Sequence, residues 1–200
     1  MKNSFFFTFL CFAGLAGCQA DVAPNENVPA LHERFHGKYK PINSVASEPV
    51  DVNFDGRSSN NLIHEIGDDL TSSDLEINII DKGKHVEERT FLFTQTWPEQ
   101  YVHAPFSTRE PTAYDPNLIV NYARQPATRK FDFDRSIRII QIRPDQKPIA
   151  SDTVRFAPPE AVTVEGKGYI KVVNRKRLYT RDGWKTVRVE TLYERYTMST

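Results

Sequence analysis

The chain has few of the cysteines that stabilise small folds through disulfide bonds or bound metal ions. Only two of its 200 residues are cysteines, Cys11 and Cys18, which excludes a disulfide framework and a cysteine-ligated zinc site. Neither charge is in excess, with 26 Lys+Arg against 26 Asp+Glu. This balance excludes a protein devoted to bulk electrostatic binding of nucleic acid. The longest apolar run is too short to span a bilayer as a helix.

What the chain does contain is typical of a folded β-protein. Its hydrophobic content is 39%, with 12% aromatics, which is too rich for a disordered chain. The 13 Phe and 8 Tyr, together with 13 Pro against only 9 Gly, favour strands and loops over long helices. The composition therefore predicts an all-β domain.

The N-terminus has the three parts of a secretory signal peptide. Lys2 supplies a positive charge, the segment from Phe5 to Leu15 is apolar, and small residues follow. The sequence Leu15-Ala16-Gly17-Cys18 resembles the lipobox of bacterial lipoproteins. In that family the chain is cut before the cysteine, which becomes acylated, so the resemblance implies a lipid anchor at Cys18. Three acyl chains, at ~0.8 kcal/mol per buried CH₂, would give a practically permanent attachment.

The segment after the lipobox predicts the domain organisation. Residues 1–17 are expected to be the signal peptide, and residues 18–30, with two prolines and no periodicity, a flexible tether. Residues 31–200 are expected to form one barrel domain. Gln19 follows the cysteine, and by resemblance to enterobacterial lipoproteins this favours the outer membrane of a bacterial envelope.

Alternation of apolar and polar residues dominates the domain. Leu75 to Ile79, Phe91 to Thr94 and Phe131 to Asp134 each alternate with period two, and Ile137 to Ile142 is rich in β-branched residues. This pattern predicts half-buried antiparallel strands. One short helix is predicted over Asn61–Ile66, before Gly67.

The C-terminal segment predicts a hairpin of Tyr169–Thr180 and Trp184–Tyr196 around Asp182-Gly183. With that turn, Leu178 faces Val187 and Val172 faces Tyr193; a turn over residues 180–183 would keep the hairpin and alter the pairing. One face of the hairpin then mixes apolar and polar residues, which suits a barrel enclosing a cavity better than a dry sandwich core. The residues of this face are Ile170, Val172, Asn174, Lys176, Leu178, Val187, Val189, Thr191, Tyr193 and Arg195.

Prolines interrupt the pattern between Trp97 and Arg129, where only Leu118–Tyr122 is predicted to be a strand. A long proline-rich connection in a compact domain is usually functional or poorly ordered.

Both ends of the domain resemble lipocalin-like proteins. Gly37-Lys38-Tyr39 resembles their first-strand motif, Gly-x-Trp, with tyrosine in place of tryptophan. Gly183-Trp184-Lys185 and Tyr193-Glu194-Arg195 resemble the last hairpin of bacterial, Bacteroidetes-type, lipocalin-like lipoproteins, which are largely of unknown function. The resemblance implies an antiparallel up-and-down lipocalin-like β-barrel, closed by Gly37, Tyr39 and Arg195. By analogy with the family, the Arg195 guanidinium is expected to stack on the Tyr39 ring.

His32-Glu33-Arg34-Phe35-His36 matches the H-E-x-x-H pattern of zinc hydrolases. That chemistry needs both histidines on one helix face, with the glutamate as general base. Gly37 and Pro41 leave no room for a long helix, so a coincidental match on a short helical turn before the first strand is favoured.

Asp51-Val52-Asn53-Phe54-Asp55-Gly56 matches the start of an EF-hand calcium loop. Oxygens from Asp51, Asn53 and Asp55 are hard ligands at the required spacing, but Leu62 stands where the bidentate acid belongs. A metal-free Asx turn uses the same residues, and both readings stay open.

These observations predict a non-catalytic, membrane-anchored envelope lipoprotein whose barrel binds a small apolar ligand or a protein partner, with no nucleic acid and no cofactor beyond a possible Ca²⁺. The alternatives are a structural or assembly lipoprotein with a filled barrel, and a zinc hydrolase that uses His32, Glu33 and His36.

Overall fold

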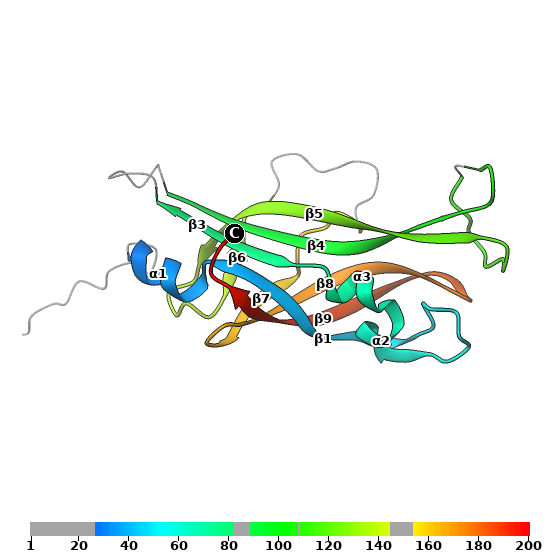
Figure 1. Ribbon diagram of the computed structural model, residues 1–200, viewed down its shortest axis with the longest axis horizontal. Helices are drawn as coiled ribbons and strands as arrows, with labels where there is room; N and C mark the ends of the chain where they lie inside the picture. The colour runs from blue at the N-terminus through cyan, green and yellow to red at the C-terminus, as the bar shows by residue number, and fades with distance from the viewer. Residues whose placement is uncertain (1–26, 82–88, 108, 145–153) are drawn as a thin grey trace, which may run out of the picture.

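The computed structural model describes residues 27–81, 89–107, 109–144 and 154–200, which form a β-barrel with three short helices (Figure 1). Cys18, the signal segment and most of the expected tether lie outside the described residues. The elements in chain order are α1 (Val28–Phe35), β1 (Gly37–Val50), β2 (Ser59–Asn61), α2 (Leu62–Ile66), α3 (Asp68–Thr71), β3 (Leu75–Asp81), β4 (Arg89–His103), β5 (Ile119–Phe133), β6 (Ile140–Ile142), β7 (Ala161–Gly166), β8 (Tyr169–Thr180) and β9 (Gly183–Thr197).

The wall of the barrel has the strand order β6-β5-β4-β3-β1-β9-β8-β7, and every pairing is antiparallel. The first and last long strands, β1 and β9, lie side by side. The two ends of this order meet where Ile139 bridges Thr163 and the Val164 N–H donates to the Arg138 carbonyl at 2.8 Å. The predicted up-and-down lipocalin-like barrel is therefore confirmed, and it is nearly closed.

Local signals explain where the predicted helix begins and ends. In α2, the Asn61 side chain accepts hydrogen bonds from the N–H groups of Ile63 and His64, and Gly67 at φ +68° ends the helix. This is the predicted short helix, which ends at Ile66 as expected and begins one residue later, at Leu62. The longer α1 begins at Val28, three residues before the expected start of the domain, and it buries Val28, Leu31 and Phe35.

The β8–β9 hairpin forms, with Thr180 paired to Gly183 and Leu178 to Lys185. Arg181 and Asp182 are therefore the central turn residues, as in the alternative turn, and the predicted pairing of Leu178 with Val187 is wrong by two positions. Because side chains alternate with period two, a shift of two residues leaves each side chain on its predicted face. Nine of the ten predicted inner-face residues are buried, and Arg195 is partly buried.

The predicted break between Trp97 and Arg129 is largely wrong. Strand β4 continues to His103 and β5 begins at Ile119, so Pro98 and Pro126 lie inside strands. Beyond Gln95, β4 has no further ladder partner in β3, and β6 pairs only with residues 131–133 of β5. The two prolines therefore sit in a two-stranded ribbon, visible in Figure 1, where a missing N–H is tolerated.

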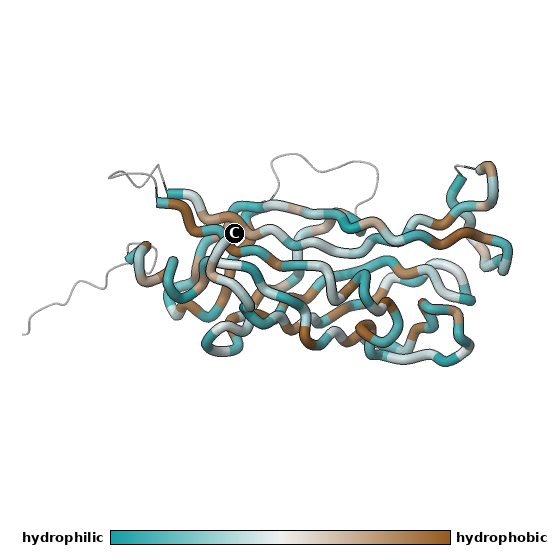
Figure 2. The backbone as a smooth tube through the Cα atoms, viewed as in Figure 1, coloured by the Kyte–Doolittle hydropathy of each residue, from teal (hydrophilic) through white to brown (hydrophobic). Residues whose placement is uncertain are grey.

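The interior has two apolar clusters, one toward each end of the barrel. The first lies under α1 and includes Phe35, Tyr39 and Phe93; the second lies beside α2 and α3 and includes Leu62, Trp97 and Val189. Figure 2 shows apolar and polar residues alternating along the strands. Several buried polar side chains also face inward, so the barrel is not filled by apolar residues alone. These are Ser44, Gln95, Glu99, Asn174, Lys176 and Thr191.

Candidate functional site

The three residues expected to close the barrel lie together beneath α1. Tyr39 and Arg195 are directly paired across β1 and β9. The buried Tyr39 hydroxyl donates to the Phe35 carbonyl at 2.6 Å. Arg195 Nη1 donates to the carbonyls of Glu33 at 3.0 Å and Arg34 at 2.9 Å. Both side chains therefore hold the carbonyl groups at the end of α1, which have no partner within the helix.

This arrangement differs from the expected stacking of a guanidinium on a ring. The cation–ring contacts found among the described residues do not include Arg195 over Tyr39. Arg195 acts through hydrogen bonds instead, because the carbonyl groups of α1 satisfy its donors. Burial raises the pKa of Tyr39 to about 12, and the nearby Arg195 charge lowers it by a smaller amount.

Gly37 has a steric role at the same end of the barrel. Its φ is +132°, and a Cβ at this position would lie 2.0 Å from the Thr197 carbonyl oxygen of β9. Any other residue would push β1 and β9 apart where they begin to pair.

The H-E-x-x-H residues are in an arrangement that favours a structural role, with His32 and Glu33 on α1 and His36 as its extended C-cap residue. The rings of His32 and His36 stack at 4.1 Å, and His36 Nδ1 accepts the Ile79 N–H at 3.2 Å. A neutral imidazole has one nitrogen lone pair, so Nε2 of His36 then carries the proton and cannot bind a metal. Burial, followed by the neighbouring His32, lowers the pKa of His36.

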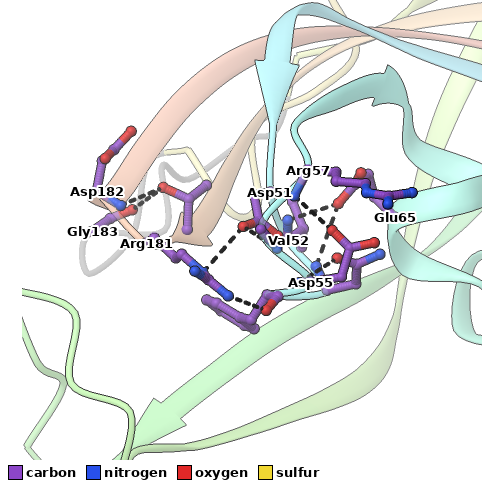
Figure 3. Close-up of polar contacts among 12 residues, drawn as sticks. Asp51, Val52, Asp55, Arg57, Glu65, Arg181, Asp182 and Gly183 are labelled. Atoms are coloured by element: carbon purple, nitrogen blue, oxygen red, sulfur yellow. Dashed lines mark hydrogen bonds and ion pairs between the residues drawn. The ribbon is translucent and has the colours of Figure 1, made fainter.

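The loop from Asp51 to Gly56 is held by its own polar side chains (Figure 3). Asn53 Oδ1 accepts the Asp55 N–H at 3.0 Å, and Asp55 Oδ1 accepts the Arg57 N–H at 2.7 Å. Asp51 Oδ2 accepts the Gly56 N–H at 3.1 Å. The bonds made by Asn53 and Asp55 are the Asx-type turns expected of a metal-free loop. Within the described parts of the chain, no three His, Cys, Asp or Glu side chains cluster closely enough to hold a metal ion.

Two further contacts join this loop to the rest of the barrel. Arg181, at the β8–β9 turn, places its Nε 3.2 Å from Asp51 Oδ2 and donates to the Phe54 carbonyl. Glu65 of α2 accepts the Val52 N–H at 2.9 Å. The hairpin tip and α2 are therefore tied to the same loop.

An uncharged polar network crosses the barrel interior. Gln95 of β4 donates to Asn174 Oδ1 of β8 at 2.9 Å and to the Tyr193 hydroxyl of β9 at 3.1 Å. Asn174 donates back to Gln95 Oε1 at 3.2 Å. These strands are not neighbours in the wall, so the network spans the lumen.

A charged cluster lies beside this network. Lys176 Nζ is 3.0 Å from Glu99 Oε1 and 4.7 Å from the centre of the Trp97 ring. Arg155 Nε approaches the other Glu99 oxygen at 3.7 Å. Only 6% of Lys176 and 3% of Glu99 is exposed. Burial lowers the pKa of the Lys176 ammonium, and the Glu99 carboxylate opposes that shift.

The sequence placed Asn174 and Lys176 on the inner face, but it did not reveal their partners. Glu99 lies after Trp97, in the proline-interrupted stretch where the sequence predicts no continuous strand, and Gln95 lies between that stretch and the alternation predicted from Phe91 to Thr94. Contact between β4 and β8 also depends on barrel closure, which local periodicity cannot encode. Proline is tolerated on the edge of a strand that pairs with no further strand, so Pro98 does not have to end β4.

The β4–β5 loop and the loop after β1 lie at the end of the barrel remote from α1 (Figure 1). The Tyr179 hydroxyl donates to the Ala113 carbonyl at 2.8 Å, and Trp184 Nε1 donates to the Pro111 carbonyl at 3.0 Å. The Phe54 ring lies 5.7 Å from that of Tyr114. Residues from the β4–β5 connection therefore pack against both the hairpin tip and the loop at Asp51–Gly56.

A groove of about 460 Å³ runs along the outside of β1, β8 and β9. Val45 and Leu192 line it, with ion pairs between Lys171 and Glu165 at 2.8 Å and between Arg188 and Glu190 at 2.5 Å. This surface combines apolar side chains with paired charged groups, a composition that is also found in protein–protein interfaces.

Comparisons with known proteins give no relative: no family model, no curated protein and no solved structure matches the chain. In the part of the chain that the structure describes, no helix has the length and apolar character to cross a membrane.

Proposed function

We propose that this chain is an envelope lipoprotein, anchored through Cys18 to the bacterial outer membrane, whose barrel binds a small, largely apolar ligand without catalysis. The observation that carries the proposal is the buried ion pair of Lys176 and Glu99, beside Trp97 in the barrel lumen.

The energetic argument starts from the cost of burying charge. Desolvating an ion pair costs about as much as its attraction returns, and apolar replacements of similar volume are often equally stable or more so. A barrel built only for stability would therefore gain little from Lys176 and Glu99. Such a pair is better explained as a recognition element for a polar group on a ligand.

The surroundings of the pair indicate the kind of ligand. One apolar cluster includes Trp97 beside the pair, and the other lies toward α1. Gln95 and Asn174 add amide donors and acceptors between them. Apolar walls with a few placed polar groups are typical of small-molecule sites. The ligand is therefore a small amphiphile, with an apolar body and one polar end directed to Lys176 and Glu99.

Native mass spectrometry of protein extracted from envelopes in mild detergent tests ligand binding. Wild type and Lys171→Met, which changes an outer-surface lysine, should carry the same co-purifying small molecule. The double variant Lys176→Met/Glu99→Leu should lose it. Equal retention by all three proteins would place the ligand elsewhere.

The anchor has its own test. In detergent phase partitioning, wild type should enter the detergent-rich phase and Cys18→Ala should not, because only the wild type would carry acyl chains. Equal partitioning would remove the lipid anchor from the proposal.

The second candidate is a structural or assembly lipoprotein that contacts another envelope protein. The outer groove along β1, β8 and β9 favours it. Crosslinking in intact cells through a photoreactive residue at Val45 would then trap one discrete partner, which the same probe at Glu48 would trap less.

A further inference from the structure

We propose that the loop from Asp51 to Gly56, together with Glu65, is a weak Ca²⁺ site in which the Arg181 guanidinium stands in for the cation until Ca²⁺ displaces it. The site is independent of the ligand proposed for the lumen.

The first observation is two buried carboxylate oxygens without partners. Asp51 is 7% exposed and Glu65 is 3% exposed. Among the residues that the structure describes, neither Oδ1 of Asp51 nor Oε1 of Glu65 has a hydrogen-bond partner. Buried polar atoms are nearly always paired, and an unpaired one costs about 1–3 kcal/mol, more for a charged group. These two oxygens are therefore available to a cation.

The second observation is that both carboxylates face the same loop (Figure 3). Glu65 Oε2 accepts the N–H groups of Val52 at 2.9 Å and Asn53 at 3.4 Å. Asp51 Oδ2 accepts the Gly56 N–H from the other end of the loop. The backbone amides thus hold one oxygen of each carboxylate and leave the other free. Glu65 supplies a carboxylate in place of the acid that the calcium-loop pattern expects at position 62, where this chain has Leu62.

The third observation is that a cationic side chain already occupies this loop. Arg181 lies 3.2 Å from Asp51 Oδ2 and donates to the Phe54 carbonyl at 2.5 Å. An acidic carboxylate and a backbone carbonyl are also ligands that Ca²⁺ takes. The Arg181 side chain is 49% exposed, so it can turn to solvent at little cost.

The ligand set predicts the affinity. Ca²⁺ accepts six to eight oxygens, including carboxylates, carbonyls and water. Two carboxylates, the Phe54 carbonyl and water fit a weak site, with a Kd of about 10⁻⁴–10⁻³ M as in extracellular modules. Mg²⁺ requires a tighter octahedral shell and gives up water reluctantly, so it should bind less well.

Thermal unfolding of the full chain in detergent, with 10 mM Ca²⁺ or 10 mM Mg²⁺ at matched ionic strength, tests the site. At this concentration Ca²⁺ is about ten to a hundred times Kd, so it should raise Tm by about 3–10 °C, and Mg²⁺ should raise it by much less. Glu65→Gln keeps the acceptor for the Val52 N–H but should lose the Ca²⁺ shift. Glu48→Gln, which removes an exposed acid on β1, should retain it.

Arg181→Gln separates a metal site from general charge screening. Without its competing cation, the loop should reach half of the Ca²⁺ shift at an at least threefold lower Ca²⁺ concentration than wild type. Three results would each overturn the proposal: no Ca²⁺ shift in wild type or Arg181→Gln, equal shifts with Mg²⁺, or an undiminished shift in folded Glu65→Gln.

Discussion

Lys176 on β8 and Glu99 on β4 form a 3.0 Å ion pair across the lumen, although their strands are not neighbours in the wall of the barrel. The pair is almost completely buried. Gln95 and Asn174 make an uncharged connection between the same two strands, nearer the start of each strand. Two side-chain contacts therefore cross the lumen and join strands that do not pair in the barrel wall.

Breaking the ion pair from one side should be costly. Lys176→Met removes the ammonium that lies 3.0 Å from the buried Glu99 carboxylate, so we expect the free energy of unfolding to fall by about 3 kcal/mol. Lys176→Met/Glu99→Leu should recover most of that loss. Urea unfolding measures both, with Lys171→Met as the surface control expected within about 0.5 kcal/mol of wild type. If Lys176→Met left the free energy of unfolding unchanged, the buried ion pair would not contribute to stability.

Arg195 should stabilise α1 more than the barrel wall. Arg195→Ala removes donors to the carbonyls of Glu33 and Arg34, and we expect a loss of about 2 kcal/mol together with faster hydrogen exchange in α1. Arg188→Ala, on the exposed face of the same strand, is the matched control and should cost under about 0.5 kcal/mol. Unchanged exchange in α1 would contradict the capping role.

Gly37 should be intolerant of a side chain for a steric reason. Gly37→Ala places a Cβ against the Thr197 carbonyl and strains a left-handed backbone, so we expect a loss of about 3 kcal/mol. Gly166 also has a positive φ, +145°, but a Cβ there would meet no atom of the described residues within 4 Å. Gly166→Ala should therefore cost only the strain, about 1–2 kcal/mol. Equal costs in chemical denaturation would refute the close approach.

The buried tyrosines should make the barrel sensitive to alkali. Burial raises the pKa values of Tyr39 and Tyr193 to about 12, against 10.0 for the ordinary side chain. The unfolded chain therefore loses these protons first, between pH 10 and 12. Stability from these groups is complete below pH 10 and is lost as the pH rises toward 12. Tyr39→Phe should flatten that decline, as measured by urea unfolding across the pH range; an unchanged slope would contradict it.

Periodicity explains how much of this architecture the sequence can predict. The sequence predicts which side chains of β8 and β9 face inward. The prediction holds although the pairing is two positions off, because a shift of two residues leaves each side chain on the same face. The exact turn was not predictable, since Arg181-Asp182 and Asp182-Gly183 are both plausible turn centres. What selects between them is tertiary: Arg181 contacts Asp51.

The candidate sites were predictable only in part, for a related reason. The motifs at Asp51–Gly56 and His32–His36 are local, and the sequence locates them. Whether they bind a metal depends on distant groups, namely the Arg181 guanidinium in one case and the Ile79 N–H in the other. Glu99 was missed because its partner Lys176 lies 77 residues away on a strand that never pairs with β4.

The most direct test of ligand binding in the lumen uses Trp97 as a reporter. The chain has two tryptophans, and Trp184→Phe leaves Trp97, stacked on Lys176, as the only one. Titrating this protein with 1-anilinonaphthalene-8-sulfonate, an apolar anion, should quench Trp97 saturably, by energy transfer to the bound probe. Adding Lys176→Met/Glu99→Leu should abolish the saturable phase. If Trp97 emission does not respond, or responds equally with and without the ion pair, the lumen is not the binding site.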